Sequence, residues 1–264
     1  MQAELDFAVD FAKTAGSYML QRHDEAIASQ KLDHSVVTDV ELELSQRFVP
    51  GVRSQFGPLV AVTNKETPVQ EHVDLEGTYW GIDPLDGTGE YVNAKVPREQ
   101  RTSCIGLYLM RGGEVQLSVV YNPFRKWLFT ATHDGASCLN GGVMATMPSG
   151  TCSAITPGVA YDYCHWDDCP VDLRPLEKAI GRSRYRYSAI SQACDVALGE
   201  SAFAVFPGNT IHDIAPGALM VERAGGVVSD LQGRPLQWDN LNGAIYACNP
   251  VVHREALRIV EVHR

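Results

Sequence analysis

Apolar residues recur at helical spacing in the first segment of the chain. Between Glu4 and Arg22 they fall three and four positions apart, which predicts an amphipathic helix. A similar pattern that starts near Asp39 predicts a second helix, ending at about Arg53. Short apolar segments then indicate strands: Leu59–Val62, Tyr79–Ile82, Ser103–Met110, Val115–Tyr121 and Leu128–Thr132. Gly112 and Gly113 separate two of these strands and predict a hairpin turn.

The second half of the chain alternates strands with helices. A turn at Asn140-Gly141-Gly142 marks a soft boundary, so we expect an α+β half over residues 1–142 and an α/β half over residues 143–264. The predicted strands are Ala154–Thr156, Tyr185–Ala189 and Ala202–Phe206, and the predicted helices are Leu173–Gly181, Ser191–Gly199, Asp213–Ala224 and Val251–Val262. This alternation predicts a parallel or mixed sheet flanked by helices.

The composition of the 264-residue chain excludes several classes of protein. Apolar residues make up 45% of it and charged residues 20%, as in a globular protein rather than a disordered, collagen-like or coiled-coil chain. No apolar run approaches the ~20 residues that cross a bilayer, and no signal peptide is evident, so we expect a cytoplasmic protein without membrane partners. The net charge of -10 argues against a nucleic acid polymer as partner.

The seven cysteines do not form a recognisable framework. Their number is odd and no Cys-x-x-Cys pair occurs, which favours reduced thiols in the cytosol. The closest pair, Cys164 and Cys169, matches no zinc motif, so we expect it in an irregular surface loop.

Candidate chemistry is concentrated in the segment Asp83-Pro-Leu-Asp-Gly-Thr88. Pro84 holds Asp83 in extended backbone, so we expect the preceding strand to end there. Two carboxylates this close repel each other unless a cation lies between them, and oxygen ligands of this kind suit Mg²⁺ or Mn²⁺. A helix that begins at Gly87 and Thr88 would direct its free N–H groups at a phosphate. The same residues also suit an ordinary turn between two elements.

Further acidic residues stand at the ends of other predicted elements. Asp39 and Asp213 each lie at a helix start, where a role as helix cap is the alternative. Glu66 follows a predicted strand, where it could equally be a solvated loop charge. Because all these acids occur at element ends, as metal ligands of an α/β protein commonly do, their combination favours a shared site.

At this point the sequence resembles the inositol monophosphatase superfamily, which includes fructose-1,6-bisphosphatases and 3′(2′),5′-bisphosphate nucleotidases. The signature is Asp83-Pro-Leu-Asp-Gly-Thr88, and the resemblance covers nearly the whole chain. Its other segments are Lys31 through Asp39, Glu66, Val119-Val-Tyr-Asn-Pro123, Leu139-Asn-Gly-Gly142, Asp213-Ile-Ala-Pro-Gly217 and Glu222-Arg-Ala-Gly-Gly226. The first signature together with the last two segments is highly specific.

The resemblance implies a layered α/β/α/β/α sandwich and a metal-dependent phosphoric monoester hydrolase. It also implies two or three Mg²⁺ ions, with Mn²⁺ as a substitute, a small phosphorylated substrate, and a homodimer. One ion would be held by Glu66, Asp83 and the carbonyl oxygen of Leu85, and a second by Asp83, Asp86 and Asp213. Most ligands would then come from the first half of the chain, and the second half would close the site.

The resemblance also assigns residues to the reaction itself. Glu66 and Thr88 would orient the attacking water, and Asp39 would polarise Thr88. The N–H groups of Gly87 and Thr88 would hold the phosphate. Cations in such a site would make an anionic substrate bindable by a protein of charge -10.

Several positions depart from the family pattern. The usual paired acids before the first metal site appear here as Asn64-Lys65-Glu66, so Glu66 alone remains as a ligand and Lys65 adds a positive charge beside it. His212 replaces the usual Trp; packing or a cap contact is one interpretation, and a substrate contact from the cleft is the other. Pro216 replaces an Ala in the first turn of a helix, where proline is tolerated. These departures affect the expected substrate and rate rather than the ligand set.

The substrate is suggested by two segments near the signature. The stretch Phe206–His212 lacks the acid with which inositol-selecting members bind ring hydroxyls, whereas Glu90 lies in a segment that resembles the nucleotidase branch. The following loop carries Lys95, Arg98 and Arg101, and is either solvated surface or an arginine pair that binds a second phosphate. We therefore expect a bisphosphate nucleotide first and an inositol phosphate or phosphosugar as the alternative. A catalytically weakened phosphate-binding regulatory protein is the alternative from another class.

Overall fold

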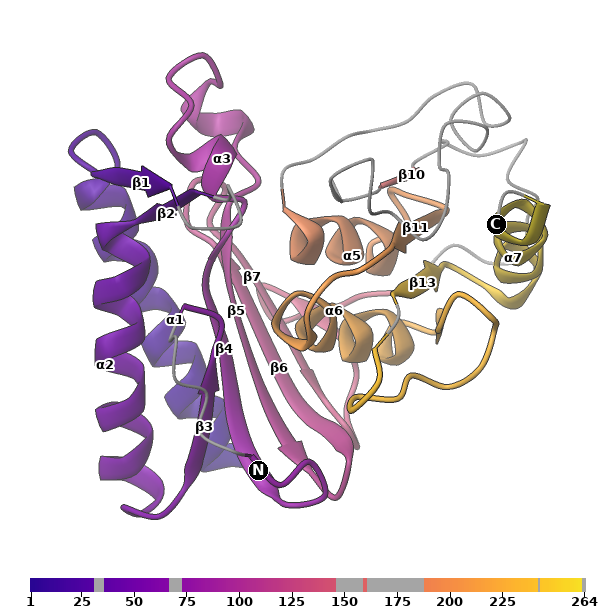
Figure 1. Ribbon diagram of the computed structural model, residues 1–264, viewed down its shortest axis with the longest axis horizontal. Helices are drawn as coiled ribbons and strands as arrows, with labels where there is room; N and C mark the ends of the chain where they lie inside the picture. The colour runs from indigo at the N-terminus through magenta and orange to yellow at the C-terminus, as the bar shows by residue number, and fades with distance from the viewer. Residues whose placement is uncertain (31–35, 67–72, 146–158, 161–187, 242, 263–264) are drawn as a thin grey trace.

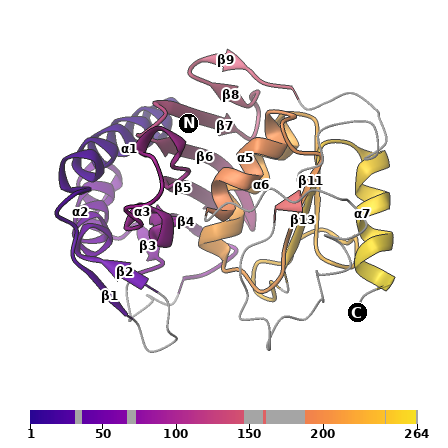
Figure 2. The ribbon, with the colours of Figure 1, turned by 90° about the horizontal axis from the view of Figure 1, so that it is seen from above.

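The computed structural model describes residues 1–30, 36–66, 73–145, 159–160, 188–241 and 243–262 of the chain. In this part, layers of helices alternate with two sheets (Figure 1, Figure 2). The seven-stranded sheet has the order β3-β4-β5-β6-β7-β8-β9. Its strands are β3 (Ala61–Asn64), β4 (Thr78–Asp86), β5 (Cys104–Arg111), β6 (Glu114–Asn122), β7 (Trp127–Thr132), β8 (Cys138–Leu139) and β9 (Gly142–Val143). β3 and β4 are parallel, and the other neighbours are antiparallel.

Two long helices, α1 (Gln2–Arg22) and α2 (Asp39–Phe56), cover one face of this sheet (Figure 1). The first lies close to the sheet because it presents small residues there; a Cβ on Gly16 would lie 2.5 Å from the Tyr121 ring. The second buries Val40, Leu44, Phe48 and Val52, four residues apart, in the same core. A short hairpin, β1 (Ala28–Gln30) and β2 (Val36–Thr38), leads into α2.

The other face of the seven-stranded sheet packs against α5 (Ala189–Ala197) and α6 (Ile211–Arg223). These helices separate it from a four-stranded mixed sheet of order β10-β11-β13-β12. The strands are β10 (Val159–Ala160), β11 (Phe203–Phe206), β12 (Val227–Ser229) and β13 (Ala244–Ala247). The last helix, α7 (Pro250–Val262), covers the far side of the four-stranded sheet (Figure 2). The layered α/β/α/β/α arrangement expected from the sequence is therefore confirmed.

Most elements predicted from hydrophobic spacing are present in the described part, within a few residues of their expected ends. The hairpin turns at Gly112-Gly113 and Asn140-Gly141-Gly142 are confirmed. The predicted strand Ala154–Thr156, the helix Leu173–Gly181, residues 185–187 of another strand, and the Cys164–Cys169 pair lie outside the described residues. Ala189 begins α5 rather than ending a strand. Strands β12 and β13 were not predicted, although β11, which has the same length as β13, was.

The prediction that the strand ends at Asp83 is wrong, because β4 continues to Asp86. The pairing register with β5 shifts between Asp83 and Asp86, and Pro84 lies within that shift. A proline lacks the N–H that a regular ladder needs, so an interruption of the ladder accommodates it. Both aspartates therefore belong to one buried strand, next to the edge strand β3 of the sheet.

Two short helices follow β4 on the chain. Gly87 has a φ of 84°, a left-handed conformation that glycine adopts without strain, and it starts the four-residue α3 (Thr88–Tyr91). A single 3₁₀ turn, η1 (Arg98–Gln100), then leads into β5. None of the described helices is long and apolar enough to span a membrane.

Candidate active site

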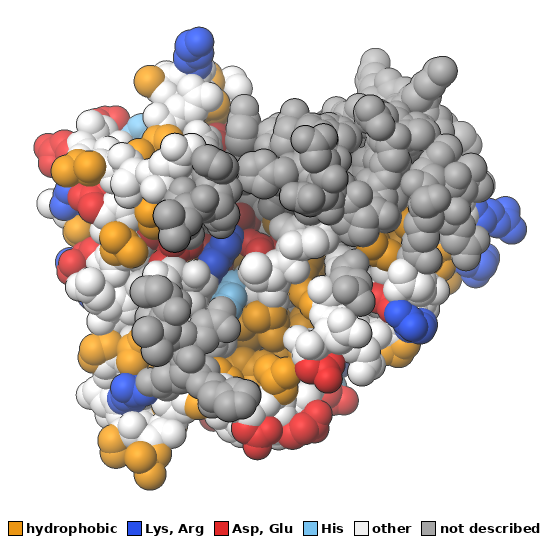
Figure 3. All heavy atoms as spheres, in the orientation of Figure 1, with side chains coloured by type: hydrophobic (Ala, Val, Ile, Leu, Met, Phe, Trp, Pro, Cys, Tyr) orange, Lys and Arg blue, Asp and Glu red, His pale blue; other side chains and the backbone are white. Residues whose placement is uncertain are grey.

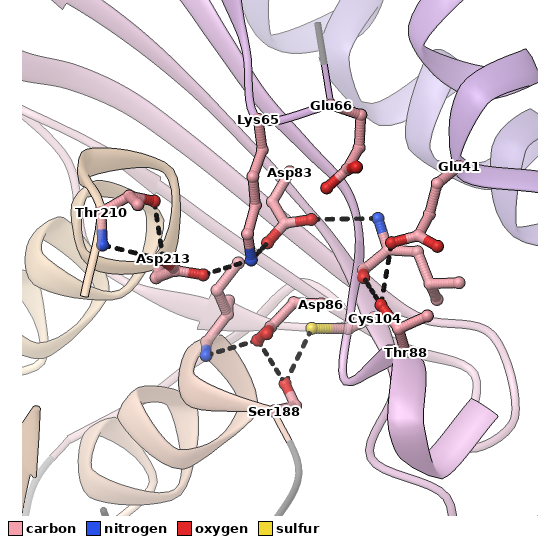
Figure 4. A network of polar contacts seen from close by, with 12 residues as sticks. Glu41, Lys65, Glu66, Asp83, Asp86, Thr88, Cys104, Ser188, Thr210 and Asp213 are labelled. Carbon is pink, nitrogen blue, oxygen red and sulfur yellow. Dashed lines mark hydrogen bonds and ion pairs between the residues drawn. The ribbon is translucent and has the colours of Figure 1, made fainter. Parts of the chain in front are cut away.

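Acidic side chains from both halves of the chain converge beside β4 (Figure 4). They come from α2, the end of β3, β4 and the start of α6: Glu41, Glu66, Asp83, Asp86 and Asp213. Oxygen atoms of the three aspartates all lie within 4.8 Å of one another, and these three residues are buried. In Figure 3, acidic, basic and histidine side chains meet in a hollow of the molecular surface.

Lys65 reaches into the middle of this cluster. Its Nζ lies 2.7 Å from Asp83 Oδ2 and 2.5 Å from Asp213 Oδ1. Burial alone would lower the pKa of Lys65, but the charges of Asp213, Asp83 and Asp86 together raise that pKa well above its usual value. Lys65 is therefore an ammonium ion at neutral pH, held between two carboxylates.

Each aspartate is also fixed by groups from its own or a neighbouring element. Asp83 Oδ1 accepts a hydrogen bond from the N–H of Leu85 at 3.1 Å. Asp86 Oδ2 accepts bonds from the Ser188 hydroxyl at 2.6 Å and from the N–H of Ile190 at 2.7 Å, at the start of α5. Burial raises the pKa of Asp83 to about 6, and burial followed by the charge of Asp83 raises the pKa of Asp86 well above its usual value.

Asp213 combines both roles that the sequence left open, because it caps α6 and lies in the acidic cluster. Its Oδ2 accepts hydrogen bonds from the N–H of Thr210 at 2.9 Å and from the Thr210 hydroxyl at 2.7 Å. Burial would raise the pKa of Asp213, but the Lys65 ammonium and the Thr210 bonds hold it below its usual value. The capping box at the start of α6 thus also holds the Asp213 carboxylate toward β4.

Thr88 is paired with Glu41, not with Asp39. The Thr88 hydroxyl donates to Glu41 Oε1 at 2.8 Å and lies 3.1 Å from the carbonyl oxygen of Leu85. The other oxygen of Glu41 accepts from the N–H and the hydroxyl of Thr38, which completes a capping box at the start of α2. Burial, and then the charge of Glu66, raise the pKa of Glu41 to about 8.

The prediction that Asp39 polarises Thr88 is therefore wrong. Asp39 Oδ2 lies 2.7 Å from Arg22 Nη2, and its Oδ1 accepts from the N–H of Ile27. Residues two positions apart on a helix face opposite sides, so Asp39 and Glu41 cannot serve the same partner. The signal in the sequence was the spacing Thr38-x-x-Glu41, a capping box that places an acid on the buried face of α2.

His212 is almost fully buried beside the acidic cluster. Its side chain is buried, and Nε2 lies 3.0 Å from the Thr63 hydroxyl oxygen. The His212 ring also packs near Tyr108, with 6.1 Å between the ring centroids. Burial lowers the pKa of His212 to about 4, so the ring is neutral near pH 7. These contacts support the packing interpretation, and the expected substrate contact stays a prediction.

Arg101 and Glu90 are used inside the loop that follows α3. The buried Arg101 guanidinium donates to the carbonyl oxygens of Glu90, Tyr91 and Asn93. The buried Glu90 carboxylate accepts from the N–H and the hydroxyl of Thr102. Both side chains are occupied in shaping the loop, and their expected role in binding substrate stays a prediction.

Arg98 is the remaining arginine of the expected pair. One of its nitrogens, Nη2, donates to the carbonyl oxygen of Leu20 at 3.0 Å, in an exposed position. Of the two arginines expected to bind a second phosphate, Arg98 alone is therefore exposed. The roles expected for the N–H groups of Gly87 and Thr88 stay predictions.

Comparison with known proteins places this arrangement in a family. The model of the "Inositol monophosphatase family" matches residues 1–263. The chain belongs to the inositol monophosphatase family. This is a family of Mg²⁺-dependent phosphatases, so the expected enzyme class is confirmed.

The relatives of this chain include proteins named as a Nus factor and proteins named as a phosphatase, all of low sequence identity. The Nus factor SuhB of Escherichia coli (strain K12) is 29% identical over 97% of this chain and 95% of its own length. The inositol-1-monophosphatase of Bacillus subtilis (strain 168) is 23% identical over 94% of this chain and 93% of its own. The solved inositol monophosphatase of Thermotoga maritima covers 99% of this chain and 98% of its own, with a TM-score of 0.85 at 23% identity. The last comparison shows the shared fold.

Among the described residues, the acids whose oxygen atoms lie close enough together to hold a metal ion are Asp83, Asp86 and Asp213. Glu66 lies close enough to Asp83 and Glu41 for its charge to raise the pKa of both. Three mutually repelling carboxylates, beside the carbonyl oxygen of Leu85, are an oxygen-rich donor set that a divalent cation would relieve. Between Asp83 and Asp213, in contrast, the Lys65 ammonium already fills the space between the two oxygens.

Proposed function

We propose that this chain hydrolyses a small phosphate monoester with the help of a divalent ion. The observation that carries the proposal is the Thr88–Glu41 hydrogen bond beside the carboxylate of Glu66. Thr88 gives its hydrogen to Glu41, so the lone pairs of its oxygen remain to accept a hydrogen from water. A water molecule held there turns its own lone pair toward a bound phosphate.

The ion would be held by Glu66, Asp83 and the carbonyl oxygen of Leu85. When bound, such an ion acidifies water and neutralises the phosphoryl oxygens. Glu41 keeps Thr88 in one orientation, because Thr38 fixes its second oxygen through two hydrogen bonds. Glu41 lies on α2 and Asp83 on β4, whereas Thr88 starts α3 and Glu66 follows β3, so several regular elements position the site.

For the substrate, we place an inositol or sugar monophosphate first and a 3′(2′),5′-bisphosphate nucleotide second. The order follows from the loop after α3, where Arg101 and Glu90 are bound to neighbouring loop groups rather than facing the site. Arg98 and Lys95 are the exposed cations left there for a second phosphate. We also place the working protein in the cytoplasm as a homodimer, in line with the family resemblance.

A phosphate-binding protein with weakened catalysis is the second candidate. Lys65 favours it, because a cation supplied by the chain neutralises aspartates that would otherwise recruit a metal ion. Several distant relatives are named as a Nus factor rather than as a phosphatase, which is compatible with such a role.

A panel of phosphate esters separates the two candidates. Phosphate release is measured with Mg²⁺ and with a chelator, for the natural chain, Thr88→Ala and the control Thr14→Ala, which removes an exposed hydroxyl on α1. We expect release that requires Mg²⁺ and falls about 100-fold in Thr88→Ala, with no change in the control. Binding of the esters without any release would instead support the second candidate.

A further inference from the structure

Lys65 is aimed by a rigid turn at the end of β3. Its N–H donates to the carbonyl oxygen of Ile82 at 3.2 Å, which continues the pairing of β3 with β4 by one residue. The preceding Asn64 is buried, and its Oδ1 accepts from the Ser45 hydroxyl at 3.0 Å and from the N–H of Glu66 at 2.9 Å. This turn sends Lys65 toward the aspartates and Glu66 to the other side of Asp83 (Figure 4).

The Lys65 ammonium occupies the position that a second divalent ion would take between its ligands Asp83 and Asp213. Nζ contacts Asp83 Oδ2 and Asp213 Oδ1 at 2.7 and 2.5 Å, and Asp86 is close enough for its charge to act on Lys65. A Mg²⁺ ion needs its oxygen ligands at about 2.1 Å. An ammonium and a divalent ion cannot share the same pair of oxygens at these distances, since both the contact and the like charges oppose it.

We propose that Lys65 is a tethered cation that excludes one divalent ion from the site between Asp83 and Asp213. The number of bound ions would therefore be smaller than the two or three that the family resemblance implies. The remaining ion would bind on the Glu66 side of Asp83. This inference rests on the metal site of the proposed function, not on turnover.

The charges around the cluster are consistent with one ion in addition to Lys65. Five acidic side chains surround a single ammonium: Glu41, Glu66, Asp83, Asp86 and Asp213. Lys65 acts on Asp83 and Asp213, whereas Glu66 and Glu41 repel each other on the other side. A divalent ion on the Glu66 side meets a negative charge that Lys65 does not contact.

Direct counting of bound Mn²⁺ tests this inference without a substrate. The whole chain is stripped with a chelator, and bound Mn²⁺ is obtained from the electron paramagnetic resonance signal of the free ion. We expect Lys65→Met to bind one more Mn²⁺ per chain than the natural protein. Lys65→Arg keeps the cation, and Lys13→Met removes an exposed lysine of α1, so both should match the natural protein. Equal binding by Lys65→Met and the natural chain would overturn the inference.

A second measurement uses the natural protein, in which Lys65 still neutralises the aspartates. In the chain labelled with ¹⁵N-lysine, an ammonium held by two carboxylates gives a slowly exchanging NMR signal, assigned by its loss in Lys65→Arg. We expect this signal to persist in millimolar Mg²⁺. If Mg²⁺ abolishes it, the ion displaces Lys65 and the inference fails. A chain that releases no phosphate but keeps this signal would refute the proposed function and leave the tethered cation standing.

Discussion

The ammonium of Lys65 lies 2.5 Å from Asp213, a residue 148 positions further along the chain. This contact joins the end of β3 to the start of α6, so it links the two halves of the molecule at the candidate active site. Asp83 completes the bridge from β4 of the seven-stranded sheet. These ion pairs therefore add to the apolar core that the two halves share.

Replacing Lys65 with Met should destabilise the metal-free protein. The change leaves Asp83 and Asp213 close together without their cation, which costs about 1–3 kcal/mol given that the Lys65 side chain keeps 26% of its surface exposed. Urea denaturation in a chelator measures this loss, and added Mn²⁺ should restore more stability to Lys65→Met than it gives to the natural chain. An unchanged denaturation midpoint would mean that the bridge contributes nothing.

Glu41→Gln should reduce kcat about 100-fold, because the amide either donates to Thr88 or accepts from it only weakly and so loses the fixed orientation of the hydroxyl. Asp39→Asn is the matched control, since Asp39 pairs with Arg22 on the other side of α2. Steady-state kinetics on the best ester of the panel compares the two variants. A larger loss of kcat in Asp39→Asn than in Glu41→Gln would contradict the assignment.

Arg101→Met should act on stability rather than on substrate choice. The buried guanidinium satisfies carbonyl oxygens of the loop after α3, and their loss of partners costs about 1–3 kcal/mol. We expect a lower Tm and an equal change in KM for a monophosphate and a bisphosphate. Arg254→Met, which removes an exposed guanidinium on α7, serves as control. A selective rise in KM for the bisphosphate would instead return Arg101 to the substrate site.

In His212→Gln, the free energy of unfolding should fall less on acidification than it does in the natural chain. Burial lowers the pKa of His212 from 6.5 to about 4, so the unfolded chain takes up the proton before the folded chain does. The stability contributed by the neutral ring is full above about pH 6.5 and is lost as the pH falls toward 4, a change of about 3 kcal/mol.

Chemical denaturation at a series of pH values measures this effect. The natural chain should lose more stability between pH 6.5 and 4 than His212→Gln does, and His133→Gln, at a partly exposed position, should behave like the natural chain. Parallel curves for the natural chain and His212→Gln would show that the buried ring does not resist protonation.

Hydrophobic spacing was sufficient to predict the long elements of the fold. The apolar faces of α1 and α2 and the buried strands of the large sheet repeat at intervals that local geometry imposes, so they can be recognised without the tertiary structure. The Asp83-to-Thr88 signature similarly predicted where carboxylates would gather, because its residues are neighbours on the chain. The short strands β12 and β13 were not predicted, although β11, which is as long as β13, was.

The amino-acid sequence by itself determined the family, the layered architecture and the segments that carry the acidic cluster. Only the tertiary structure decided the partners: that Thr88 contacts Glu41, that Arg101 faces its own loop, and that Lys65 lies between Asp83 and Asp213. The reason is that spacing along the chain determines which face of an element a residue occupies. The group that it meets there depends on the packing of segments that are far apart in sequence.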